Sequence, residues 1–176
     1  MDSSPAEGGE SDDADAEFAG FVRSRSAALH RTAYLMTGNS DAAQDVVQTA
    51  LTRIYLAWPR RAFWENRDAY ARKVVTNVVL SEGARRWRGE QPTGELPEPP
   101  ADGRSDDVTL LAERDALRRA LMALPVRQRT AVVLRHYVDL SEADTAATMD
   151  CPLNTVKSLT ARGLAALRTH VEGARS

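Results

Sequence analysis

Residues 89–107 divide this chain into two short segments, and no other feature of the sequence limits the fold as strongly. The stretch contains four of the eight prolines of the chain and almost no apolar side chain, so it cannot contribute to a packed core. Its prolines favour an extended backbone, which is typical of a linker. In a chain of 176 residues, each flanking segment is then long enough for only one small domain.

Charge follows the same division. Residues 1–17 carry seven acids and no base, 18–88 carry twelve bases and five acids, 89–107 carry one base and six acids, and 108–176 carry ten bases and seven acids. The net charge of −2 therefore hides two basic segments, at +7 and +3, and two acidic ones, at −7 and −5. Basic segments suit a polyanion such as DNA, whereas acidic, apolar-poor segments tend to be disordered.

Apolar residues recur at helical spacing on both sides of the linker, and no strand-like alternation is present. We therefore predict an all-α protein made of two small helical domains, at 17–88 and 108–176. A disordered acidic tail is expected at 1–16, and a flexible acidic linker at 89–107.

Start and stop signals divide the N-terminal domain into three helices. Gly38 is a good C-terminal stop for the first helix, and Pro59 ends the second. Asn39 or Ser40 can cap the second helix and Asn66 the third, because these side chains accept hydrogen bonds from free backbone N–H groups.

The C-terminal domain is predicted to hold four helices, which begin near Val108 and are first interrupted at Pro125. Ser141 caps a short third helix, 150–152 form a tight turn, and the last helix runs from about Leu153 to Val171. A two-turn helix, a tight turn and a longer helix have the proportions of a helix-turn-helix. Small or basic residues near the start of the last helix can reach base edges and phosphates, although an αα-hairpin with a solvated polar face would show the same pattern.

Residues 124–168 resemble region 4 of the sigma-70 superfamily. The likeness lies in a Leu-Pro-x-x-x-Arg opening at 124–129, a Leu-Ser-x-x-Asp middle at 140–144 and a Thr-Val-Lys-Ser run at 155–158. It implies that the last helix recognises a −35 promoter element through Asn154, Thr155, Lys157, Ser158, Leu159 and Arg162. The family usually has arginine at position 159 and alanine at position 163, where this chain has Leu159 and Gly163.

Residues 29–58 resemble region 2 of the same superfamily, through Asp45-Val46-Val47-Gln48. The resemblance implies that Asp45, Gln48 and the following Thr49, where the family usually has an acid, face core RNA polymerase. Helical spacing agrees, because it turns Val47, Leu51 and Ile54 toward the core and Gln48 away from it.

Residues 68–88 resemble the parts of region 2 that capture the −10 element. The resemblance assigns this contact to the polar side and basic end of the third helix, at Arg72, Lys73, Asn77, Arg85, Arg86 and Arg88. Phe63 and Trp64 in the preceding loop are candidates to stack on an unpaired base, and the alternative is that either ring fills the core.

Together these likenesses extend from residue 18 to 168 in a two-domain form that resembles the extracytoplasmic-function (ECF) sigma factors, closest in style to the actinobacterial SigE-like members. They imply an RNA polymerase sigma factor whose partners are core polymerase and promoter DNA, with an anti-sigma factor as a candidate partner and no homo-oligomer. One alternative is a stand-alone helix-turn-helix regulator, although the Asp45–Gln48 motif would have no use there. Another is a degenerate sigma-like chain that only sequesters a partner, which Thr49 and Leu159 would favour.

Neither an enzyme nor a cofactor or metal site is expected. His30, His136 and His170 fall on different predicted helices, and Cys151 lies in a turn without an adjacent base. The sequence has no apolar run of membrane-spanning length and begins with acids rather than a basic, then apolar, signal segment, so a cytoplasmic location is expected.

Overall fold

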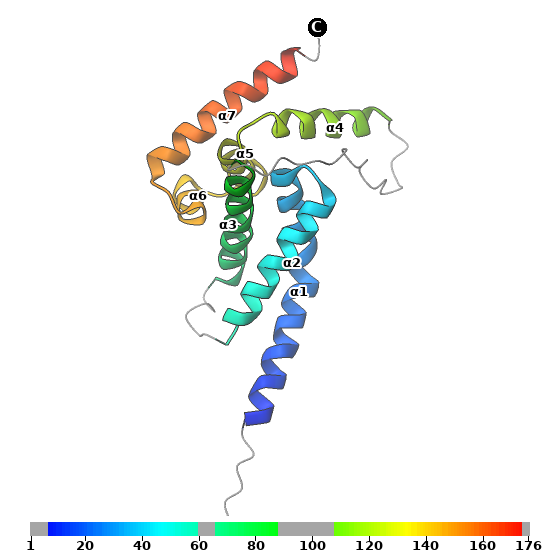
Figure 1. Ribbon diagram of the computed structural model, residues 1–176, viewed down its shortest axis with the longest axis vertical. Helices are drawn as coiled ribbons and strands as arrows, with labels where there is room; N and C mark the ends of the chain where they lie inside the picture. Colours follow the sequence, from blue (N-terminus) through cyan, green and yellow to red (C-terminus); the bar gives the residue numbers. More distant parts are fainter. Residues whose placement is uncertain (1–6, 60–65, 88–107, 174–176) are drawn as a thin grey trace, which may run out of the picture.

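The computed structural model describes residues 7–59, 66–87 and 108–173, and within these ranges the chain forms helices and short connections only (Figure 1). The elements are α1 (Glu7–Thr37), α2 (Ser40–Ala57), α3 (Arg67–Trp87), α4 (Val108–Met122), α5 (Val126–Val132), the π-helical turn η2 (Val133–Tyr137), α6 (Glu142–Met149) and α7 (Leu153–Gly173). The predicted all-α class is confirmed. The predicted linker at 89–107 lies outside the described residues.

The predicted helix boundaries are set by local capping. Gly38 has a φ of +72°, a left-handed conformation that glycine adopts without strain, and it ends α1. The Asn39 side chain accepts a hydrogen bond from the Ala42 backbone N–H at 3.0 Å and caps α2. Asn66 caps α3 in the same way, at 2.9 Å from the Ala69 N–H, and Ser141 caps α6. These three capping predictions are confirmed.

Helix α1 begins at Glu7, so the prediction of disorder is wrong for residues 7–16. The acids of this segment lie near the positive end of the helix dipole, which stabilises them there. Tertiary contacts add to this, because Ala14 packs against the buried cluster and the Asp15 carboxylate accepts a hydrogen bond from the Tyr55 hydroxyl at 3.0 Å. Composition alone could not reveal these contacts with α2. Residues 1–6 lie outside the described residues.

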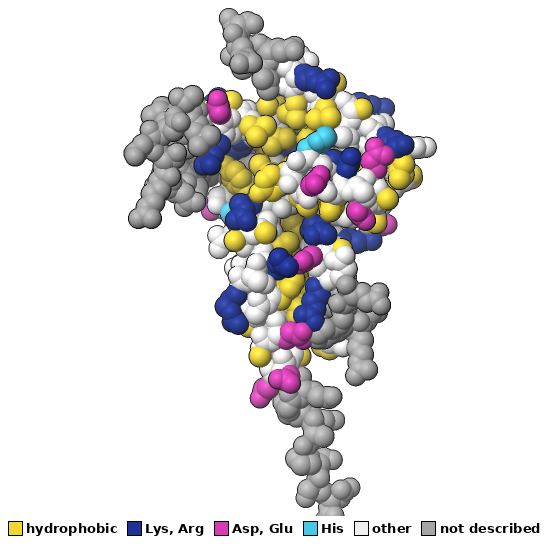
Figure 2. Space-filling view, turned by 180° about the vertical axis from the view of Figure 1, so that it is seen from behind, with side chains coloured by type: hydrophobic (Ala, Val, Ile, Leu, Met, Phe, Trp, Pro, Cys, Tyr) yellow, Lys and Arg dark blue, Asp and Glu magenta, His cyan; other side chains and the backbone are white. Residues whose placement is uncertain are grey.

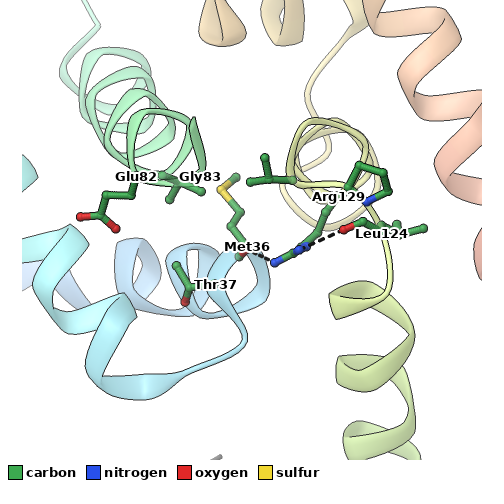
Figure 3. A pocket seen from close by; sticks show the side chains of 9 residues that line it. Met36, Thr37, Glu82, Gly83, Leu124 and Arg129 are labelled. Atoms are coloured by element: carbon green, nitrogen blue, oxygen red, sulfur yellow. Dashed lines mark hydrogen bonds between the residues drawn. The ribbon is translucent and has the colours of Figure 1, made fainter. Parts of the chain in front are cut away.

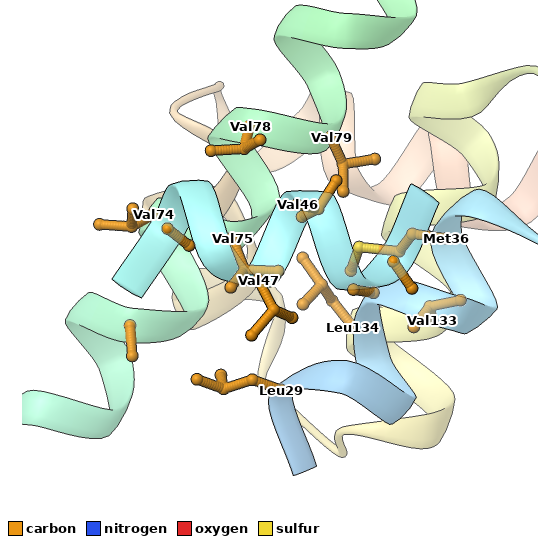
Figure 4. Packing of buried hydrophobic residues seen from close by; sticks show 14 of the residues in the cluster. Leu29, Met36, Val46, Val47, Val74, Val75, Val78, Val79, Val133 and Leu134 are labelled. Atoms are coloured by element: carbon orange, nitrogen blue, oxygen red, sulfur yellow. The ribbon is translucent and has the colours of Figure 1, made fainter. Parts of the chain in front are cut away.

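The two halves of the chain share one hydrophobic core. Helices α1, α2 and α3 form the N-terminal half, and their buried side chains include Leu29, Met36, Val47 and Val75 (Figure 4). Val133 and Leu134 of the C-terminal half, both almost fully buried, belong to the same cluster. The sequence predicted two domains joined by a linker, and it gave no sign that they pack against each other.

Helix α7 packs closely on α5 at Gly163. A Cβ atom at this glycine would lie 2.7 Å from Cγ2 of Val132 and 3.3 Å from the backbone oxygen of Gln128. Both distances are shorter than an ordinary van der Waals contact, so glycine allows the two helices to approach. This contact explains why α7 carries a residue that disfavours helices at an inward position.

Candidate functional site

Helix α2 turns one continuous stripe of side chains to solvent. Six of its exposed residues recur at helical spacing and share a face, and Gln44, Arg53 and Tyr55 are exposed beside them. The six are Asp41, Asp45, Gln48, Thr49, Thr52 and Leu56. The opposite face is buried, with Val46, Ala50 and Ile54 fully inaccessible. Val47 and Ile54 are buried, Leu51 packs partly against the core and Gln48 is exposed, as helical spacing predicted.

The same stripe contains an apolar residue that sequence reasoning missed. Leu56 is 71% exposed, the highest value among the exposed large hydrophobic side chains of the described residues. It lies eight residues after Gln48 and eleven after Asp45, so the helical repeat places it on the same face. That spacing is visible in the sequence, but the sequence analysis assigned no role to Leu56.

An aromatic cluster joins the middle of α1 to the end of α2 and the start of α3. Trp58, which is 2% exposed, has its ring centroid 5.1 Å from that of Phe18 and 5.3 Å from that of Phe21. The guanidinium carbon of Arg67 lies 5.0 Å from the centroid of the Trp58 ring, and Arg67 also forms an ion pair with Glu17 at 2.5 Å. These contacts hold Trp58, after the end of α2, and Arg67, at the start of α3, against α1.

Asp15 extends this cluster to Tyr55 at the surface. The hydrogen bond from the Tyr55 hydroxyl to Asp15, followed by the negative charge of that carboxylate, raises the pKa of Tyr55 above its ordinary value of 10.0. The protonated hydroxyl is therefore favoured by the fold. The contact is fully present at neutral pH and is lost only as the pH rises through the raised pKa.

The candidate −10 residues on α3 fall on two sides of that helix. Lys73 and Asn77 are half-buried and lie one turn apart, while the neighbouring Arg72 is half-buried with its Nε atom buried. Arg85 and Arg86 lie in the last turn of α3, where only the backbone is described. Phe63, Trp64 and Arg88 lie outside the described residues.

Helices α6 and α7 form a helix-turn-helix. Asp150 ends α6 in the left-handed conformation, at φ +51°, and Thr155 N–H donates to the Pro152 carbonyl at 2.9 Å as α7 begins. Asn154 and Lys157 are exposed on α7, and the Lys157 ammonium lies 3.6 Å from the Glu142 carboxylate of α6. The predicted tight turn between a two-turn helix and a long one is confirmed.

The remaining −35 candidates on α7 differ in their exposure. Arg162 is exposed, whereas Thr155 and Ser158 are half-buried, with the Ser158 hydroxyl donating to the Thr155 carbonyl at 3.0 Å. Leu159 is half-buried and packs against the hydrophobic cluster, so its side chain contributes to the domain core. Packing therefore accounts for a leucine at this position without a contact to DNA.

Basic side chains are spread along the molecule. On the face shown in Figure 2, Lys and Arg side chains extend over most of its length, and hydrophobic side chains gather toward the end where α4 and α7 lie. In the described part of the chain, no three His, Cys, Asp or Glu residues are grouped to hold a metal ion. No helix in the described ranges combines the length and apolarity needed to cross a membrane.

Two family models match the chain in the order that its two halves predict. The model described as sigma-70 region 2 matches residues 21–89, and that described as sigma-70, region 4 matches 114–167. RNA polymerase sigma-E factor of Streptomyces coelicolor is 40% identical over 152 residues, which cover 86% of this chain and 84% of that protein. The chain belongs to the ECF sigma factors of the sigma-70 family. Sigma factors are regulatory proteins rather than enzymes, and here α1–α3 correspond to region 2 and α4–α7 to region 4.

More distant sigma factors are also similar to this chain in sequence or in structure. The ECF RNA polymerase sigma factor SigM of Mycobacterium tuberculosis is 34% identical over 141 residues, covering 79% of this chain and 69% of SigM. The sigma factor RpoE of Bartonella quintana, solved with the anti-sigma factor NepR, has a TM-score of 0.69 at 23% identity, covering 89% of this chain and 97% of RpoE. CnrH, solved with the cytosolic domain of CnrY, has a TM-score of 0.61 at 18% identity, covering 89% of this chain and 88% of CnrH. These structural likenesses establish the fold.

Proposed function

We propose that this sigma factor attaches to core RNA polymerase through the α2 stripe, with Asp45, Gln48 and Thr49 at the centre of the contact and Leu56 at its edge. The observation that carries the proposal is that the motif residues Asp45 and Gln48 are exposed on one face together with an exposed leucine. Neither side chain forms an ion pair or hydrogen bond with another described residue, so both are available to a partner. Protein interfaces combine apolar side chains with polar groups that remain close to solvent.

Promoter DNA is then held at two places. Region 2 contacts the −10 element through α3, with Lys73 and Asn77 on its polar side and Arg72, Arg85, Arg86 and Arg88 as cationic contacts to the backbone. Phe63 and Trp64 supply surfaces on which an unpaired base can stack. We take the region 2 domain to include α1 from Glu7, because that segment packs against α2.

Region 4 contacts the −35 element through the first turns of α7. Asn154 and Lys157 are exposed there and can reach base edges or phosphates, and Arg162 lies one turn further on for a backbone contact. Thr155 and Ser158 lie between them, and Leu159 supports the helix from the core side.

The remaining expectations follow from this role. The protein acts without a catalytic site or cofactor of its own, as a single copy per polymerase, in the cytoplasm where transcription occurs. An anti-sigma factor is the expected regulator. Support for such a partner comes from the two structural relatives, each of which was solved in a complex, RpoE with an anti-sigma factor and CnrH with the cytosolic domain of CnrY.

Run-off transcription tests the function directly. Purified protein is added to core polymerase from the same organism, on a library of genomic fragments, and discrete new start sites are expected. Core polymerase that binds the protein but yields no new starts would favour a sequestering role. Absence of core binding would favour a stand-alone regulator, and either result would contradict the proposal.

The Lys157–Glu142 pair gives a prediction for −35 binding. Lys157→Ala is expected to weaken binding to duplex −35 DNA by about 1 kcal/mol or more and to reduce the salt slope by about 1, because one phosphate contact is lost. Glu142→Gln should strengthen binding to the same DNA and increase the salt slope, because Glu142 competes with DNA for the Lys157 ammonium group. Fluorescence anisotropy over a salt series measures both variants. An unchanged slope in Lys157→Ala would show that this side chain faces away from DNA.

A further inference from the structure

We propose that Thr49 is a phosphorylation site, at which a phosphate transferred from ATP by a separate serine/threonine kinase strengthens docking of the α2 stripe on core polymerase. The inference rests on the proposed function, because it takes this stripe as the docking surface. Three features of the described residues point to the site: the unbonded hydroxyl of Thr49, the charges around it and its place at the centre of the stripe.

The Thr49 hydroxyl differs from those of the other threonines described as exposed. In Thr52 and Thr169 the hydroxyl donates to the carbonyl of the residue four positions earlier, at 3.0 and 3.2 Å. The same kind of bond occupies Thr37, which lines a pocket of about 370 Å³ (Figure 3) and donates to the Ala33 carbonyl at 2.9 Å. Thr49 is exposed and forms no such bond with a described residue. Its hydroxyl is therefore left to solvent, where a modifying enzyme can reach the oxygen.

The other hydroxyl groups of α2 are less suited to modification. Tyr55 is exposed, but its hydroxyl donates to the Asp15 carboxylate at 3.0 Å, and that negative charge would repel a phosphate. Ser40 is half-buried at the first position of the helix and lies outside the stripe. Among the described hydroxyls of α2, Thr49 alone is both exposed and without a hydrogen-bond partner.

The charges around Thr49 allow α2 to carry a phosphate there. Asp45 lies four residues before Thr49 and Asp41 eight before it, so both carboxylates share its face of the helix. Arg53 lies four residues after Thr49 and is exposed, with no ion pair to a described residue. An acid followed by a base four residues later is the favourable order for a pair on a helix. Arg53 therefore offsets the repulsion between the phosphate and Asp45, and α2 stays folded.

A phosphate strengthens the charge that the stripe already carries. The stripe has two carboxylates and no basic side chain, so a partner surface that fits it offers positive groups and hydrogen-bond donors. Phosphothreonine carries about −1.5 to −2 charges at neutral pH and three strong acceptor oxygens. At the centre of the stripe, these add charge-assisted hydrogen bonds to such a partner and speed its approach. We therefore expect tighter docking rather than blocked docking.

The transfer step requires only the hydroxyl from this chain. The Thr49 Oγ1 atom attacks the γ-phosphorus of ATP, and the new oxygen–phosphorus bond forms as the bond from that phosphorus to the bridging oxygen of ADP breaks. The hydroxyl proton passes to a base of the kinase, and ADP leaves. Since docking covers the stripe, the kinase acts on the free protein.

Protein with phosphothreonine built in at position 49 during translation measures the effect of the phosphate by itself. Its Kd for core polymerase, from fluorescence titration of the full chain, should fall by about tenfold relative to the unmodified protein. The gain should shrink as the salt concentration rises, because salt screens charges at an exposed surface. The control carries phosphothreonine at position 169, which is exposed on α7 outside the stripe, and its Kd should not change. Equal circular dichroism spectra establish that α2 remains folded.

A second measurement tests whether the organism modifies this residue. Purified protein is incubated with ATP and an extract of the same organism, and trypsin then releases residues 32–53, in which fragmentation separates phosphate on Thr49 from phosphate on Thr52. Phosphate on Thr49 is expected. Its absence, or an unchanged or raised Kd for the phosphothreonine protein, would overturn the inference while binding of the unmodified protein still supports the proposed function. Absence of core binding by both forms contradicts the proposed function instead.

Discussion

Replacing Asp45 and Gln48 together by alanine is expected to abolish binding to core RNA polymerase while leaving the protein folded. Both side chains are exposed at the centre of the α2 stripe and form no ion pair with a described residue, so their removal disturbs no internal contact. Truncating a hot-spot residue commonly costs about 2 kcal/mol or more. Two such losses correspond to roughly a thousandfold increase in Kd, at about 1.4 kcal/mol per factor of ten.

Fluorescence titration of labelled protein with core polymerase measures this effect. The control is Asp13→Ala with Glu113→Ala, which removes two exposed polar side chains from α1 and α4, outside α2, and should leave Kd unchanged. Leu56→Ser should weaken binding on its own, because it removes the apolar part of the same surface. A folded double variant with normal affinity would exclude this docking site, and equal thermal melting curves establish that it is folded.

Replacing Gly163 by alanine is expected to lower the free energy of unfolding by about 1–2 kcal/mol, because overpacking a core outweighs the better helix propensity of alanine. The added Cβ would lie 2.7 Å from Cγ2 of Val132, whereas carbon atoms prefer separations of about 3.5–4.0 Å. Val132 is buried and its β-branched side chain has few alternative rotamers, so α5 and α7 must move apart.

Urea denaturation measures whether Gly163→Ala lowers or raises the free energy of unfolding. Ala165→Gly is the control, because Ala165 is exposed on the same helix and should show the propensity effect alone, a loss of about 1 kcal/mol. Val132→Ala combined with Gly163→Ala should cost less than the sum of the two single changes, since the smaller side chain makes room for the new methyl group. A more stable Gly163→Ala protein would mean that the helices are free to separate at this point.

Several elements of the fold were predictable because their signals are local. Helix ends depend on a few neighbouring residues, and Gly38, Asn39, Asn66 and Ser141 therefore gave the boundaries correctly. The same holds for the turn at Asp150 and for the buried side of α2, where apolar spacing alone placed Val47 and Ile54 inward. The family motifs lie on these elements, which is why the sequence indicated their function as well.

Other features depended on contacts between residues distant in the sequence. The first turns of α1 contact Tyr55 of α2, Leu159 packs against the core, and Gly163 lies close to Val132. Leu56 shows the opposite case, in which a residue with a clear apolar preference lies outside the core. The stacking role predicted for Phe63 and Trp64 remains a prediction.

The sequence by itself determined most of the helices, three caps, the helix-turn-helix and the division into two basic regions, because each depends on periodicity, capping or charge within a short stretch. Only the tertiary structure decided that region 4 closes on region 2, through Arg129 at the end of α1 and Val126 at Gly83. Such a contact requires complementary surfaces on segments separated by a linker, and hydrophobic spacing shows which side of a helix is buried but not which partner buries it.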